Sequence, residues 1–271
     1  MRSSKEITLD KKILTALETL SPSGKAVKMA KLLLGDEEIH ALQDYANTVS
    51  IKRLGYNDHG PVHMCTVAFN ALRMMELLRK ADIKTSLETE ESGDFEDSLT
   101  AVLMAGFLHD VGMTMGRQDH EVHGSYLAAP IIDRLLLKVY PANIPLRISV
   151  RSLALEAISG HMGNRIIHSL EAGVILVADG CDMEKGRARI PIALANEPRV
   201  GDIHKYSSNS IEQVRISAGK EQPIRIDVVM SAEVGLFQVE EVLLGKIAAS
   251  TAKGYIELYA LEKGKKPKRY L

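Results

Sequence analysis

Four histidines and two aspartates have the residue types and surroundings expected of metal ligands. They are His63, His109, Asp110, His120, His161 and Asp179. Each lies at the end of a predicted helix or on its apolar face, where a polar group without a partner is costly to bury. Imidazole and carboxylate suit borderline and hard divalent metals, and bundled helices can direct such groups inward from separate segments. The set therefore predicts a metal site.

Each of these residues taken alone has a second interpretation. A single histidine on an apolar helix face is often a hydrogen-bonded core residue, and an adjacent His-Asp pair occurs by chance in many chains. Asp179 is more informative because it follows the apolar run 172–178. A carboxylate buried in such a run must be paired or coordinated.

Together the motifs resemble the HD superfamily of metal-dependent phosphohydrolases. The resemblance rests on His63 in HMCTV at the start of one helix, the doublet His109-Asp110 in AGFLHDVG, and Asp179 in ILVADGCD. It covers roughly residues 56–185. It implies an all-helical hydrolase domain that uses divalent metal ions, with Mn, Fe, Co, Ni and Mg as candidates.

The resemblance also implies that the site holds two metals. His120 in DHEVHG looks like the intermediate histidine of two-metal HD proteins, and His161 in ISGHMG lies where that branch has a further one. Asp110 would then bridge the metals. The first metal would be completed by His63, His109 and Asp179, and the second by His120 and His161. His123, one helical turn from His120, is the alternative ligand at that position.

His59 is a candidate general acid. The stretch YNDHGPVHMCTV is similar to the part of the HD-fold cyclic-nucleotide phosphodiesterases in which a histidine lies four residues before the metal-binding histidine. In that group it protonates the leaving oxygen. A loop histidine without a role is the competing interpretation.

Three cations follow the last candidate ligand. Lys185, Arg187 and Arg189 in MEKGRARIP lie close enough to the metals to hold a substrate phosphate. A solvated loop is the alternative for this segment.

The elements that must position these residues are mainly helices. Apolar residues recur at helical spacing over residues 11–81, and again over 99–108, 120–140, 146–159 and 166–182. Residues 85–98 are acidic and polar and predict a surface loop. Beyond residue 210 the pattern changes to strands at 211–216, 224–230 and 255–261, with a helix at 236–247.

The predicted fold is therefore mainly α, an HD-type helical bundle with a small C-terminal α/β appendage. Residues 1–187 are expected to form the metal-dependent hydrolase domain, and residues 188–271 a linker and a β-β-α-β subdomain. The basic stretch 263–269 is expected to be a solvated tail, and the appendage is a candidate surface for homodimer formation.

Composition restricts the partners. The net charge of −1 gives no general attraction for nucleic acid or anionic lipid. Two cysteines are too few for a disulfide framework, and no apolar run approaches membrane-spanning length. The expectation is a cytoplasmic protein that acts on a small molecule, without a membrane or nucleic-acid partner.

The function expected from the resemblance is hydrolysis of a phosphate ester, that of a nucleotide or a cyclic nucleotide. The extended His-Glu and Gly-Tyr-Pro signature of the cyclic-di-nucleotide phosphodiesterases does not follow in GHMGNRI, so the sequence does not favour cyclic-di-GMP. Two alternatives stay open: a di-iron oxygenase with the same fold, and a nucleotide-sensing module that binds without turnover.

Overall fold

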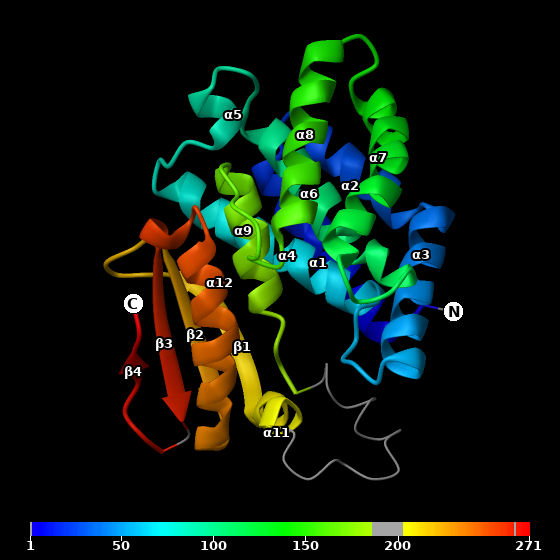
Figure 1. Cartoon of the computed structure of the whole chain (residues 1–271). Helices are drawn as coiled ribbons and strands as arrows, with labels where there is room; N and C mark the ends of the chain where they lie inside the picture. The colour runs from blue at the N-terminus through cyan, green and yellow to red at the C-terminus, as the bar shows by residue number, and fades with distance from the viewer. Residues whose placement is uncertain (1, 186–202, 263) are drawn as a thin grey trace.

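The computed structural model describes residues 2–185, 203–262 and 264–271, and its first part is helical (Figure 1). The elements of that part are α1 (Ser4–Leu20), α2 (Lys25–Leu34), α3 (Glu37–Thr48), the π-helical turn η1 (Val49–Arg53), α4 (Pro61–Lys80), α5 (Ser86–Thr89), α6 (Phe95–Leu108), the 3₁₀ turn η2 (Val111–Thr114), α7 (His120–Val139), α8 (Ile144–Gly160) and α9 (Leu170–Gly180).

The second described part contains a sheet and short helices. Its elements are α11 (Ile203–Ser210), β1 (Ile211–Ala218), β2 (Ile224–Met230), the 3₁₀ turn η3 (Glu233–Gly235), the π-helical segment η4 (Gln238–Leu243), α12 (Leu244–Ala249), the 3₁₀ turn η5 (Lys253–Tyr255), β3 (Ile256–Glu262) and β4 (Lys268–Arg269). The predicted fold class, a mainly α protein with a small C-terminal α/β appendage, is confirmed.

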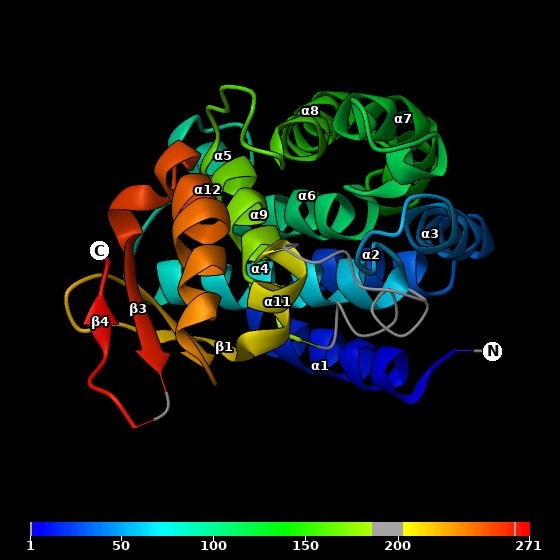
Figure 2. The same cartoon turned by 60° about the horizontal axis from the view of Figure 1, so that its bottom comes forward.

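Helices α6 and α9 form the centre of the helical part. Every residue of both helices is buried, as expected for helices that are apolar on all sides. Helix α6 packs against α4, α8 and α2, and α9 packs against α4, α8 and α6 (Figure 2). The two most apolar segments of the sequence are therefore the innermost, and both end at candidate metal ligands.

The polar segment 85–98 is more ordered than the sequence predicts. It contains α5 and the first turn of α6, so the prediction of a loop was wrong for those residues. Thr85 with Glu88 and Asp94 with Asp97 each form a capping box, in which both side chains bond to backbone N–H groups. The polar residues that suggested a loop instead cap two helix starts.

The C-terminal sheet has the strand order β1-β2-β3-β4. Strands β1 and β2 are antiparallel, β2 and β3 are parallel, and β3 and β4 are antiparallel. The parallel pair requires a crossover, which the chain makes through η4 and α12. Strand β4 is a short addition to the predicted β-β-α-β order, in the basic stretch expected to be a solvated tail.

The appendage contacts the helical part on two sides. Helix α4 contacts β1 and β2, and α9 contacts α12 and η4 (Figure 1). The linker predicted to start at residue 188 lies outside the described residues, so the domain boundary stays a prediction. Within the part of the chain that the structure describes, no helix is both long and apolar enough to cross a membrane.

Candidate metal centre

The six predicted ligands are brought together by the ends of five helices. His63 lies in the first turn of α4, His109 and Asp110 follow the end of α6, His120 begins α7, His161 follows α8, and Asp179 is near the end of α9. All six are buried. A bundle that brings helix ends together can thus assemble a site from positions far apart in the sequence.

Two glycines allow the close approach of the elements that carry these ligands. A Cβ on Gly106 would lie 2.7 Å from Cα of Ala68, so the crossing of α6 over α4 needs a glycine there. A Cβ on Gly112 would lie 1.9 Å from the carbonyl oxygen of His120. The glycine after the doublet therefore lets the start of α7 pack against the turn that carries Asp110.

Asp110 is at the centre of the cluster and its two carboxylate oxygens face different histidines. Oδ2 lies 3.1 Å from Nε2 of His63 and 3.4 Å from Nε2 of His109. Oδ1 lies 3.2 Å from Nε2 of His120 and 3.4 Å from Nε2 of His161. A carboxylate whose two oxygens face different sets of ligands can bridge two cations.

Asp179 joins the side of the cluster that contains His63. Its Oδ1 lies 3.3 Å from Nε2 of His63 and 3.9 Å from Nε2 of His109. The donor atoms form three overlapping groups, each within 4.8 Å: His63 with His109 and Asp110, His109 with His161 and Asp179, and Asp110 with His120 and His161.

Hydrogen bonds at Nδ1 orient all four histidine rings. Nδ1 of His109 is 3.0 Å from the Gly106 carbonyl oxygen, that of His120 is 2.9 Å from the Arg117 carbonyl, and that of His161 is 2.7 Å from the Ile158 carbonyl. A carbonyl can only accept, so each Nδ1 carries the proton and Nε2 keeps its lone pair. His63 has the same arrangement with a carboxylate, since its Nδ1 lies 2.7 Å from Oδ2 of Asp182.

The resulting donor set fits a cation. Nε2 of His63 and Nε2 of His109 are 3.0 Å apart, and those of His120 and His161 are 3.2 Å apart. Lone pairs that face each other at this distance repel one another unless a positive charge lies between them. Histidines oriented by a carbonyl or a carboxylate at the second nitrogen are the usual arrangement around protein-bound metals.

Burial and charge keep the cluster in its ligand form. Burial lowers the pKa of His161 to about 4, so this ring is neutral at neutral pH. Burial by itself would raise the pKa of Asp110, but the neighbouring histidines outweigh it and hold that pKa well below its usual value. Burial would also raise the pKa of Asp179, but Lys246 and His63 outweigh it and hold that pKa well below its usual value.

His59 lies beside this cluster, at the cavity described below. Its ring centroid is 5.8 Å from that of His63, and its Nδ1 lies 2.6 Å from the Asn57 carbonyl oxygen and 2.9 Å from Oγ of Ser50. The carbonyl fixes the proton on Nδ1. The other ring nitrogen, Nε2, is then the atom that can gain or lose a proton during a reaction.

Two further predicted residues, His123 and Lys185, do not join the cluster. His123 is half-buried, and its Nδ1 has no hydrogen-bond partner among the described residues. Lys185 is exposed and does not line the cavity. Arg187 and Arg189 lie outside the described residues, so their predicted contact with phosphate stays a prediction.

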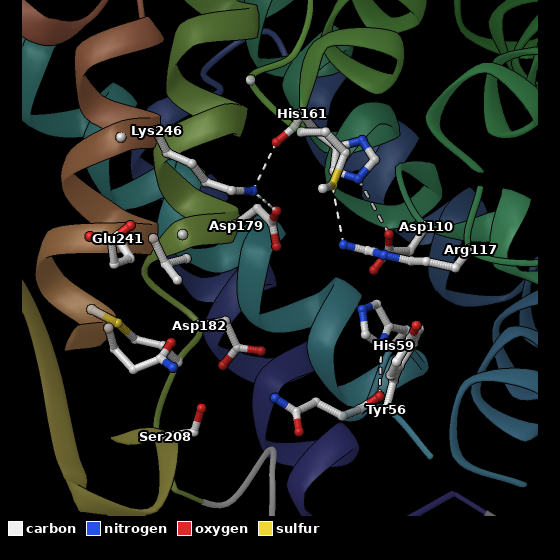
Figure 3. Close-up of a pocket in the computed structure, with 18 of the residues that line it drawn as sticks. Tyr56, His59, Asp110, Arg117, His161, Asp179, Asp182, Ser208, Glu241 and Lys246 are labelled. Atoms are coloured by element: carbon white, nitrogen blue, oxygen red, sulfur yellow. Dashed lines mark hydrogen bonds and ion pairs between the residues drawn. The ribbon is translucent and has the colours of Figure 1, made fainter. Parts of the chain in front are cut away.

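A cavity of about 860 Å³ opens onto the cluster and is lined by both parts of the chain (Figure 3). Tyr56, His59 and Arg117 line it from the helical part, and Gln238, Glu241 and Lys246 from the segment η4–α12. Its volume is in the range of about 300–1,000 Å³ typical of small-molecule sites.

Sequence reasoning missed three polar residues at this site. Asp182 orients His63, Lys246 donates to Oδ2 of Asp179, and Arg117 enters the cavity. Asp182 has a detectable signal, since it lies three residues beyond Asp179. Lys246 has none, because it belongs to a different subdomain and resembles any helical surface lysine.

Comparison with known proteins agrees with the fold and the cluster. The sequence model of the HD domain matches residues 62–184. The uncharacterized protein MJ1020 of Methanocaldococcus jannaschii is 40% identical over 235 residues, which cover 87% of this chain and 88% of that protein. No solved structure matches the chain. The chain belongs to the HD domain family, a family typified by metal-dependent phosphohydrolases.

Proposed function

We propose that the protein is a metal-dependent phosphohydrolase that hydrolyses a phosphate ester, that of a nucleotide being the expected kind. The observation that carries the proposal is the position of the Asp110 carboxylate, whose two oxygens face two separate pairs of histidines. This arrangement suits a pair of divalent metals. Such a pair would supply a hydroxide nucleophile at neutral pH and neutralise charge on the phosphoryl oxygens.

The residues of the chain then have distinct tasks. His63, His109 and Asp179 would hold one metal, His120 and His161 the other, and Asp110 both. Asp182 would keep the ring of His63 in the correct tautomer. His59 would donate the proton that the leaving oxygen needs when its bond to phosphorus breaks. Its position at the cavity, beside His63, supports this role.

Elemental analysis with an activity assay tests this proposal. Protein purified without chelators is expected to contain two divalent metals per chain and to release phosphate or alcohol from phosphate esters when supplied with Mn²⁺, Co²⁺, Ni²⁺ or Mg²⁺. EDTA should abolish the activity and metal should restore it. Two irons with dioxygen consumption and no ester hydrolysis would indicate the oxygenase. Nucleotide binding without turnover by fully loaded protein would indicate the sensing module.

A further inference from the structure

Two cations reach the candidate metal centre from different parts of the chain. Arg117 lies in the loop between η2 and α7, and Lys246 lies on α12 of the C-terminal appendage. Figure 3 shows their side chains directed from opposite sides toward the space bordered by Asp110, His161 and Asp179. Neither residue has an obvious signal in the sequence.

Arg117 is a cation that forms no ion pair with the residues that the structure describes. Its guanidinium contacts Nε2 of His120 at 3.4 Å and Sδ of Met162 at 3.7 Å. No carboxylate of the described residues forms an ion pair with it. An anionic ligand in the cavity would give this guanidinium a counter-charge and acceptors for its N–H groups.

The position of Arg117 is tied to that of a candidate ligand. Its carbonyl oxygen accepts from Nδ1 of His120, so the same residue orients the ring and sends its side chain into the cavity. Nε2 of His120 has one lone pair, which cannot both bind a metal and accept from Arg117. When that lone pair binds metal, the guanidinium donors are directed to another acceptor, and a bound oxyanion is placed to be that acceptor.

Lys246 connects the appendage to the opposite side of the centre. Its Nζ donates to Oδ2 of Asp179 and, at 2.9 Å, to the His161 carbonyl oxygen. An ammonium group has three N–H donors, so one remains for a ligand in the cavity. Ser250 and Thr251 fix the far end of α12, since their hydroxyls donate to the carbonyls of Gly173 at 2.9 Å and Ser169 at 2.6 Å.

We propose that Arg117 and Lys246 form a clamp for a dianionic phosphoryl group, and that the substrate is therefore a phosphomonoester. The inference rests on the proposed phosphohydrolase function and names its substrate class. A phosphomonoester dianion offers two negative charges and three non-bridging oxygens, whereas a diester offers one charge and two such oxygens. Two metals and two additional cations match the first group better than the second.

Carboxylates that line the cavity limit what the phosphate can be attached to. Asp182, Glu184 and Glu241 are among the lining residues. Glu184 already accepts from the Val214 N–H at 3.0 Å, and Asp182 from His63. Carboxylates there would repel a second phosphate and would accept hydrogen bonds from hydroxyls. The expected leaving group is thus an uncharged, hydroxyl-rich alcohol such as a nucleoside or a sugar.

The reaction balances with water as the only co-reactant. Water adds to phosphorus, the ester P–O bond breaks, and its electron pair leaves with the alcohol oxygen. The water oxygen stays on phosphorus, and the water loses one proton while the leaving alcohol oxygen gains one. The products are therefore an alcohol and inorganic phosphate. The clamp would hold phosphoryl oxygens throughout, which makes Arg117 a substrate-binding residue and gives the appendage a direct part in the site.

Titration of inorganic phosphate into the Mn²⁺-loaded protein by calorimetry tests the clamp without turnover. Wild type should bind phosphate, and Arg117→Met should raise the Kd about 10- to 100-fold, the loss expected for one charge-assisted hydrogen bond. Lys246→Met should weaken binding similarly, and Lys246→Arg should restore part of it. Arg215→Met and Lys253→Met are matched controls, because both residues are exposed and neither lines the cavity. Metal content is measured for every variant.

Arg117→Met is the decisive variant, because Lys246 also holds Asp179 and its loss can release metal. Wild-type phosphate affinity in Arg117→Met with its metals retained would overturn the clamp. A second assay compares p-nitrophenyl phosphate with bis(p-nitrophenyl) phosphate. Wild type should have the higher kcat/KM on the monoester, and Arg117→Met should lose that preference. A wild type that prefers the diester refutes the substrate class alone. A loaded wild type that cleaves neither ester refutes the proposed function, and the phosphate titration still decides the clamp.

Discussion

The candidate ligands and the cations around the cavity are held in opposite ways. Each ligand histidine is buried, and its Nδ1 is fixed by a carbonyl or a carboxylate of its own helical part. Arg117 is only half-buried, and Lys246 comes from the appendage to bond with Asp179 and His161. The ligand histidines are thus fixed by burial and by hydrogen bonds at Nδ1, whereas the two cations reach the site on long, flexible side chains.

This difference suggests a division of labour. A metal centre needs donor atoms fixed to within a few tenths of an ångström, which short side chains on helix ends can provide. Substrate recognition requires contacts that change when a ligand arrives, and long side chains at the border of the cavity suit that. Changes to the inner cluster should therefore alter metal binding, while changes to the surrounding cations should alter substrate binding with the metals retained.

The largest expected effect is that of Asp110→Ala. It removes the only side chain among the described residues whose oxygens face both histidine pairs. Without the shared anion, two cations at this separation would repel each other, so metal content and hydrolytic activity should both be lost. Metal analysis and a phosphate-ester assay measure this, with circular dichroism to check folding. A folded variant that keeps two metals would show that the cluster does not depend on a bridge.

The next effect is that of His59→Ala, and it should depend on the leaving group. A general acid contributes about 10²–10⁴-fold to a rate when the leaving oxygen needs a proton. We expect a fall of that order in kcat for an ester of an ordinary alcohol. For p-nitrophenyl phosphate the fall should be much smaller, because p-nitrophenolate leaves without protonation. Equal losses on both substrates would indicate a structural role for His59 beside His63.

The candidate metal centre could be predicted from the sequence because its signals are local. Asp179 ends an apolar run and His109-Asp110 follows another, and a helix that is apolar on all sides must lie at the centre of the fold. His120 and His161 lie at helix ends in the same way. The order and context of these residues, through the resemblance to the HD superfamily that they carry, predicted that the six lie together.

The surrounding contacts could not be predicted because they depend on tertiary packing. Lys246 reaches Asp179 only because α12 packs against α9. Arg117 lies in a short loop where its charge looked like that of any solvated residue. The polar segment 85–98 shows the same limit. Its polar residues cap the starts of α5 and α6, and α5 has only 4 residues, too few to show a helical period.

A smaller effect, confined to the metals, is expected of Asp182→Ala. Asp182 bonds to Nδ1 of His63 at 2.7 Å and is not itself in a predicted ligand group. Loss of such a supporting carboxylate typically costs about 10- to 100-fold in metal affinity. Calorimetric titration of Mn²⁺ into metal-free protein measures this. Asp133→Ala is the matched control, since Asp133 is exposed on α7 and pairs with Arg151. Unchanged affinity in Asp182→Ala would show that the ring of His63 needs no second partner.

The smallest expected effect is that of His123→Ala, and it distinguishes two neighbouring histidines on α7. His120 begins the helix and its Nε2 lies 3.2 Å from that of His161. His123 lies less than one turn further on, and its Nδ1 is buried without a hydrogen-bond partner among the described residues. We therefore expect His123→Ala to keep both metals and to change kcat/KM by less than about twofold, whereas His120→Ala should lose one metal.

The stability of His123→Ala should also change little. An unsatisfied buried polar atom costs about 1–3 kcal/mol, which is comparable to the packing that the truncation removes, so the free energy of unfolding should stay close to that of wild type. Metal analysis and urea unfolding of the two variants measure both quantities. Loss of a metal from His123→Ala, with His120→Ala unaffected, would reverse the assignment and would require α7 to turn its other histidine toward Asp110.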